Sequence, residues 1–151
     1  MARFSCDGMD GFVISMEEMA RLDDDAVDSI LMAGAEVVRK AHVDAISQTF
    51  DQHTAKLIGS PHIHLKIGGG RNGHAARERY ALIYPEGEHH TYHAVKGDGI
   101  ARNADLGFVH EFGGHGNRAT NWMFNANLQC SGAMAEAEEK AYDAWLTKHN
   151  L

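Results

Sequence analysis

A long amphipathic segment in the first third of the chain constrains the fold more than any other feature. Three aspartates, Asp23 to Asp25, lead into it, and aspartate both caps the free amides and suits the dipole of a helix N-terminus. Small and apolar residues then recur at steps of three and four: Val27, Ile30, Leu31, Gly34, Val37, Val38, Ala41 and Ala45. Because that spacing places them on one helix face, we expect a helix of about six or seven turns reaching toward Phe50. Its apolar face is expected to pack on a sheet.

The middle of the chain is typical of strands. Residues 62–68 alternate apolar and polar side chains, while 79–87 and 90–97 are rich in Tyr, Ile and Val between Gly and Pro. These patterns predict three strands. The glycine-rich run within 68–78 predicts a hairpin connection, and 97–103 predicts a second glycine-rich loop that becomes ordered on binding neighbours.

A second helix is predicted after Thr120, with a break near Gly132. Its apolar residues share one face: Cys130, Met134, Ala137, Ala141 and Trp145. The order of helix, strands and helix predicts an α+β fold in a single domain over residues 1–151. In this fold the long N-terminal helix and the C-terminal helix pack on a mainly antiparallel β-sheet.

Further predictions concern the N-terminus and the cysteines. Residues 3–14 are typical of a short strand and turn, and Ser15 begins an S-x-x-E capping box that predicts a short helix over 16–22. Cys6 and Cys130 are too few and too far apart for a disulfide framework or a CxxC site, so we expect reduced thiols. Since the chain has neither a signal-peptide pattern nor an apolar run of the ~18 residues that a membrane span needs, we expect folding in a cytoplasm and no membrane partner.

The charge balance argues against nucleic-acid binding. The chain has 14 Lys and Arg against 21 Asp and Glu, a net charge of −7 with histidine neutral. Its basic residues are scattered, with no run longer than Arg39-Lys40. Binding to phosphates needs clustered Lys and Arg, so we expect no specific nucleic-acid binding.

The segment GFVHEFGGHG, residues 107–116, resembles a zinc-protease motif at first sight. In the H-E-x-x-H motif the histidines are four apart and meet one metal on one side of a helix. His110 and His115 are five apart, which separates them by about 140° around a helix. Gly113 and Gly114 also interrupt any helix between them. We expect no metal here.

Other histidines leave one alternative open. His62 and His64 share a strand face, and a neighbouring strand over 89–93 offers a third ligand. His89 and His93 themselves lie about 13 Å apart along a strand, too far for one ion. The alternative function is therefore a small metal-dependent hydrolase that uses strand histidines.

The rest of the sequence predicts no enzyme. The glycine-rich run lacks the GK[ST] of a phosphate loop, there is no G-x-S-x-G elbow, and neither cysteine has a histidine nearby in sequence. We therefore expect no catalytic residue, no cofactor and no metal. A small toxin-like or regulatory binding module is a further possibility for which the sequence has no positive feature.

Residues 103–127, NADLGFVHEFGGHGNRATNWMFNAN, resemble a motif of the HK97 gp10-like family of phage tail-completion or head–tail joining proteins. The residues that match its two parts are Phe108, Val109, Glu111, Phe112 and Gly113, followed by Trp122, Met123, Phe124 and Ala126. Earlier segments, Ala33 to Val38 and His53 to Ser60, are also similar to that family. Ala55 and Asn125 stand where the family commonly has Gly and Arg.

The resemblance implies a non-enzymatic structural protein of the virion neck, assembled in the host cytoplasm. Its partners would be other neck, connector and tail proteins, and its copies would form a homo-oligomeric ring. The resemblance leaves open whether the chain acts in tail completion or as a stopper or adaptor.

Physical roles follow for the residues of this motif. Phe108 and Phe112, four apart, would share a helical face and pack the sheet against the long helix, and Gly113 would end that turn. Glu111 would accept backbone amides, bind a basic group on the next subunit, or face solvent. Bulky residues before the last helix would pack in the core or touch a neighbouring subunit. The candidate subunit-interface residues are Phe108, Glu111, Phe112, Trp122, Met123 and Phe124.

Overall fold

The computed structural model describes residues 22–68, 78–93 and 97–149. Helices and strands follow in this order: α2 (Asp24–Thr49), α3 (Gln52–Ile58), β1 (Pro61–Ile67), β2 (Arg79–Pro85), β3 (Glu88–His93), β4 (Gly97–Arg102), α4 (Asn103–Phe112) and α5 (Trp122–Lys148). The expected α+β class is confirmed. The predictions for 3–14, 16–22 and Cys6, and most of the predicted 68–78 connection, lie outside the described residues.

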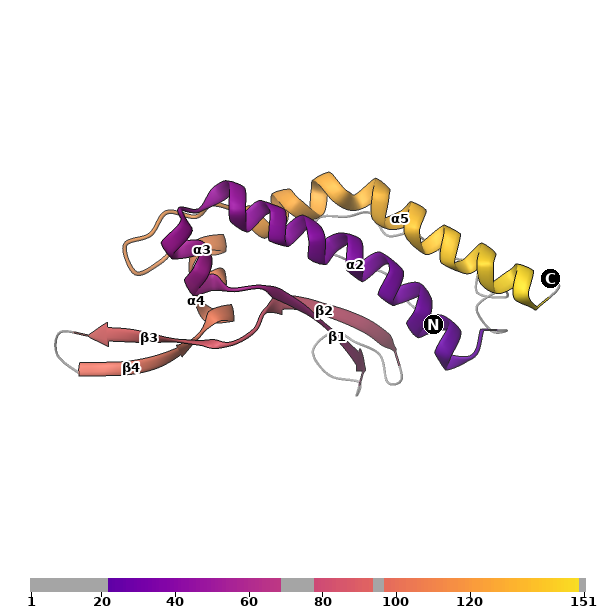
Figure 1. Ribbon diagram of the computed structural model, residues 1–151, viewed down its shortest axis with the longest axis horizontal. Helices are drawn as coiled ribbons and strands as arrows, with labels where there is room; N and C mark the ends of the chain where they lie inside the picture. Colours follow the sequence, from indigo (N-terminus) through magenta and orange to yellow (C-terminus); the bar gives the residue numbers. More distant parts are fainter. Residues whose placement is uncertain (1–21, 69–77, 94–96, 150–151) are drawn as a thin grey trace.

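The long helices α2 and α5 lie side by side and run in opposite directions, with α2 between α5 and the β1–β2 hairpin (Figure 1). The short helices α3 and α4 gather at the end where α2 finishes and α5 begins. The β3–β4 hairpin extends away from this body (Figure 1). No helix in the described part of the chain is both long enough and apolar enough to cross a membrane.

Helix α2 confirms the first prediction and corrects its packing. The Asp23 side chain accepts a hydrogen bond from the Ala26 amide at 2.7 Å, as an N-cap residue should. The buried face differs from the predicted stripe. Val27, Val37, Ala41 and Ala45 of the stripe are only half-buried, whereas Ala26, Ala35, His42 and Ile46 are buried. The reason is that α2 packs against α5 as well as against the sheet.

The β1–β2 pair is antiparallel, from Pro61 opposite Pro85 to Ile67 opposite Arg79. Arg79 donates through Nε to a carboxylate oxygen of Asp28 on α2 at 2.7 Å, and a second bond runs from its Nη2. Because alternate residues of a strand share a face, the face of Arg79 is the one turned to α2. This arginine holds the pKa of Asp28 below its usual range, mainly by hydrogen bonding.

The β3–β4 pair corrects the loop predicted over 97–103. Those residues form β4 and the start of α4, and β4 pairs antiparallel with β3. In the described residues the two hairpins are separate two-stranded sheets rather than one.

Asn103 fixes the point where the β3–β4 hairpin leaves the body. Its Nδ2 donates to the Glu86 carbonyl at 2.9 Å, and its Oδ1 accepts from Nδ1 of His89 at 3.0 Å. Gly59 and Gly87 both have positive φ, and a Cβ on either would lie 2.8 Å from the same Nδ2. The close approach and the backbone conformation therefore both require glycine at these two positions.

Helix α5 is continuous from Trp122 to Lys148, so the predicted break at Gly132 is wrong. A glycine inside a helix costs about 0.5–1 kcal/mol relative to alanine, which packing along a long helix easily offsets. The buried residues of α5 are Trp122, Ala126, Cys130 and Glu138.

Candidate interaction surface

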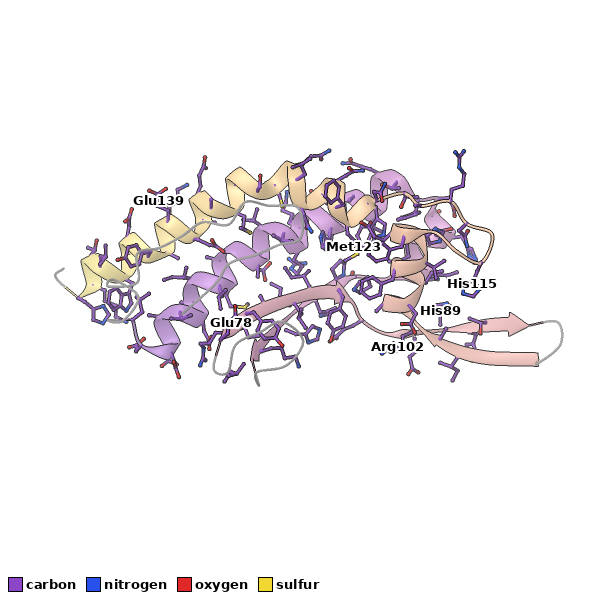
Figure 2. The ribbon with its side chains drawn as sticks, turned by 180° about the vertical axis from the view of Figure 1, so that it is seen from behind. Glu78, His89, Arg102, His115, Met123 and Glu139 are labelled. Atoms are coloured by element: carbon purple, nitrogen blue, oxygen red, sulfur yellow. The ribbon has the colours of Figure 1, made fainter. Side chains whose placement is uncertain are left out.

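The junction between α4 and α5 is organised by Glu111. Its carboxylate accepts hydrogen bonds from the backbone amides of Met123 at 2.7 Å and Phe124 at 3.1 Å, and Figure 2 places Met123 at this junction. Asn121, the residue before α5, is left-handed with φ 51° and makes no side-chain cap. Glu111 thus caps α5 from another helix and places a negative charge at the positive end of its dipole.

These two hydrogen bonds, called here the Glu111 clamp, confirm one of the three roles expected for this residue. The side chain is only 4% exposed. It therefore stabilises the fold within one chain and offers no open contact to a neighbour.

The turn before α5 is fixed by glycine and by threonine. Gly113 ends α4 with φ 80°, as predicted, and a Cβ there would lie 3.0 Å from the Ala119 amide nitrogen. Thr120 donates to the His110 carbonyl from both its amide and its hydroxyl, each at 2.8 Å. The end of α4 and the start of α5 are thereby joined at several points.

Trp122 anchors the same junction in the core. It is 2% exposed, packs with Ile46 and Ile58, and donates from its indole nitrogen to the Gly107 carbonyl at 3.0 Å. His42 lies edge-on to its ring at 5.4 Å. The expected core role is confirmed, which leaves Trp122 no free surface for a subunit contact.

Phe108 and Phe112 correct another prediction. They share a helical face and stack on each other at 6.3 Å, but this face points outward: the exposed fractions are 41% and 74%. An adjacent side of α4, about 100° around the helix, carries the Gly107 carbonyl and Glu111, which bind α5. Those contacts turn the two phenylalanines to solvent instead of between sheet and helix.

Exposed apolar side chains remain on both helices. They are Phe108 and Phe112 on α4 and Phe124 and Leu128 on α5, and these four side chains together are called here the aromatic surface. Leu128 was missed from sequence, although its position four residues after Phe124 places it on the same helix face. Of the six candidate interface residues, Phe108, Phe112 and Phe124 are exposed, Met123 is half-buried, and Glu111 and Trp122 are buried.

The strand histidines lie elsewhere. Nε2 of His64 is 2.9 Å from Oε1 of Glu86 but lacks hydrogen-bond geometry, and Nδ1 of His62 is 3.8 Å from the same carboxylate. His89 turns instead to Asn103 at the base of the hairpin (Figure 2). Within residues 22–68, 78–93 and 97–149, no group of three or more His, Cys, Asp or Glu is arranged to hold a metal ion. The hydrolase alternative therefore stays a prediction.

The two histidines of segment 107–116 occupy different surroundings. The His110 ring lies against Phe50 at 4.9 Å. His115 is exposed in the loop beyond α4 (Figure 2).

A groove of about 370 Å³ runs between the C-terminal half of α2 and the N-terminal half of α5. Its lining mixes alanines with polar side chains such as Gln48, Asn125 and Gln129, and Cys130 also lines it. Burial raises the pKa of the Cys130 thiol, which favours the unreactive protonated form.

Comparison of the chain with protein-family models, with curated proteins and with solved structures found no match.

Proposed function

We propose that this protein is a non-enzymatic structural component of a phage neck, which joins the head connector to the tail as a ring of identical copies. The resemblance of residues 103–127 to the HK97 gp10-like family supports this role. The observation that carries it is the distribution of apolar side chains between core and surface.

More large apolar side chains are exposed than buried in the described residues. Those that are buried and larger than alanine or cysteine are Ile30, Leu31, Val38, Ile46, Ile58 and Trp122. Those that are exposed are Leu65, Ile67, Leu82, Ile100, Phe108, Phe112, Phe124 and Leu128. Aromatic residues are enriched at interfaces. This distribution favours a protein whose exposed apolar side chains are covered by partner proteins.

The aromatic surface suits such a contact because its backbone is already fixed. The Glu111 clamp and the Trp122 hydrogen bond hold α4 and α5 in place before any partner arrives. A surface that does not have to become ordered on binding loses less entropy. Phe112, the most exposed member, is the side chain we expect to lose most surface to a neighbouring neck protein.

The β3–β4 hairpin supports contacts between copies. A two-stranded hairpin is marginally stable by itself, and Ile100 on this one is 65% exposed. Head-to-tail packing of the hairpin on a neighbouring copy would build a ring when the rotation between copies closes. The net charge of −7 also suits a ring through which DNA passes without adhering.

Deletion of the gene from the phage or prophage that encodes it tests this proposal. We expect DNA-filled heads and separate tails in electron micrographs, with loss of plaques. Supplying the wild-type chain from a plasmid is the control and should restore joined particles. Tailed, infectious particles at unchanged yield after deletion would contradict the proposal.

A further inference from the structure

The carboxyl group of Glu138 is buried between the two long helices. It is 3% exposed and lies over Gly34 of α2, where an added Cβ would collide with it. Its Oε2 has no hydrogen-bond partner in the part of the chain that the structure describes. An isolated carboxylate in such a place is unfavourable, and burial raises the pKa of Glu138 to about 7.

Among the described residues no charged group offsets this burial. The buried α2 residues beside Gly34 are Leu31, Ala35 and Val38, none of which titrates. The charged residues nearest along the two helices are exposed or half-buried: Glu36, Arg39, Glu136, Glu139 and Lys140. Tyr142 lies one turn beyond Glu138, and His42 lies two turns from Gly34. Within the part of the chain that the structure describes, burial alone raises the pKa of Glu138.

A second polar group further along α5 is also unpaired. Nε1 of Trp145 is buried and has no hydrogen-bond partner. Trp145 stacks on Tyr142 at 6.4 Å and lies 4.5 Å from the His149 ring, so aromatic packing holds this part of the helix. Buried polar groups without partners weaken a helix contact. Among the described residues two of them lie on α5 beyond residue 137, and Nδ1 of His42 on α2 is another, beside Trp122.

We propose that the C-terminal half of α5, from Glu138 onward, is a pH-dependent latch on α2. The latch is closed while the Glu138 carboxyl is protonated, and it opens when the group ionises and seeks water. Opening exposes the α2 face around Ile30 and Leu31, against which Ala141 and Tyr142 pack. The latch is a property of the chain itself and does not depend on the neck role.

The direction of the effect follows from the two pKa values. The folded chain holds the Glu138 proton up to about pH 7, whereas the usual value for glutamate is 4.5. The folded state therefore binds more protons between these pH values, and the closed latch weakens as the pH rises. Above pH 7 the group is ionised in both states, so the pH dependence levels off.

Amide hydrogen exchange along α5 tests the latch. In the wild-type chain we expect protection of residues 138–148, corrected for intrinsic exchange rates, to fall about thirtyfold between pH 5 and pH 7. Glu138→Gln, which keeps the shape without the charge, should stay protected at both pH values. Glu139→Gln is the matched control, because Glu139 is exposed and points away from α2 (Figure 2), and it should behave like the wild type.

Two further measurements keep the test decisive if Glu138→Gln folds poorly. The carboxyl carbon of Glu138, followed by NMR, should titrate with a midpoint near 7. Gly34→Ala should displace the carboxyl group to solvent and abolish the pH dependence. Wild-type protection that does not change between pH 5 and pH 7, an equal loss in Glu138→Gln, or a carboxyl midpoint near 4.5 would overturn the proposal.

Discussion

The two halves of helix α5 are held to the molecule in different ways. At its start Glu111, Thr120 and Trp122 all have hydrogen-bond partners across the α4–α5 junction. In its second half Glu138 and Trp145 bury polar atoms that have no hydrogen-bond partner among the described residues. The start of α5 is called here the anchored end. The half from Glu138 onward is called here the conditional end, because we propose that its contact with α2 depends on pH.

The apolar packing around the two halves differs as well. The anchored half belongs to a cluster of Ile46, Ile58 and Trp122, to which Phe50 and Leu106 add. The conditional half rests on Ile30 and Leu31, with Leu22, Val27 and Ala141 packed around them. The largest side chain of the core is therefore at the anchored end, and variants at the two ends should differ in stability.

Trp122→Ala should have the largest effect. It removes the central side chain of the anchored cluster and leaves the Gly107 carbonyl without its donor, which we expect to cost about 3–5 kcal/mol in the free energy of unfolding. Urea denaturation followed by circular dichroism measures this. Trp145→Ala is the matched control at the conditional end and should cost less, because its indole nitrogen has no partner to lose. Equal costs would remove the distinction between the two ends.

The pH dependence of stability should give the next largest effect. Since the Glu138 pKa is raised to about 7 from 4.5, the free energy of unfolding should fall by up to about 3 kcal/mol as pH rises between these values. Urea denaturation of the wild type and of Glu138→Gln at matched pH isolates this contribution, because the other titrating groups are common to both chains. Parallel pH profiles would show that Glu138 does not act at the conditional end.

Glu111→Ala should have an intermediate effect at the anchored end. Loss of the clamp leaves two α5 amides without their acceptor, at a cost of about 1–3 kcal/mol. Thermal unfolding measures the cost. The control is Glu136→Ala, at an exposed acid of α5, which should change stability by less than about 0.5 kcal/mol. If the two variants were equally stable, the clamp would contribute nothing.

Much of the fold was predictable because local patterns specify it. The apolar stripe from Val27 to Ala45 and the aspartate before it are sufficient to predict helix α2, and Gly113 predicts the end of α4. Strand β4 was missed because Gly97 and Gly99 disfavour strands, and only pairing with β3 makes one. The continuity of α5 through Gly132 likewise depends on tertiary packing.

The site was less predictable than the fold. The spacing of Phe108 and Phe112 shows that they share a face, but the side on which Gly107 and Glu111 meet α5 decides that this face is outward. Glu138 sits in the charged run EAEEK and resembles a solvated residue. Only the glycine opposite it on another helix explains its burial, and sequence spacing within one helix does not contain that information.

The central claim is that the aromatic surface joins this protein to its neighbours in the neck. Its most direct test is to complement the gene deletion with Phe112→Ser, a change at a 74% exposed side chain that should alter stability by no more than about 0.5 kcal/mol. Ile67→Ser, at an exposed apolar residue of β1 outside this surface, is the matched control. We expect unjoined heads and tails with Phe112→Ser and normal particles with Ile67→Ser. Infectious yield that Phe112→Ser leaves unchanged, or that Ile67→Ser reduces equally, would contradict the claim.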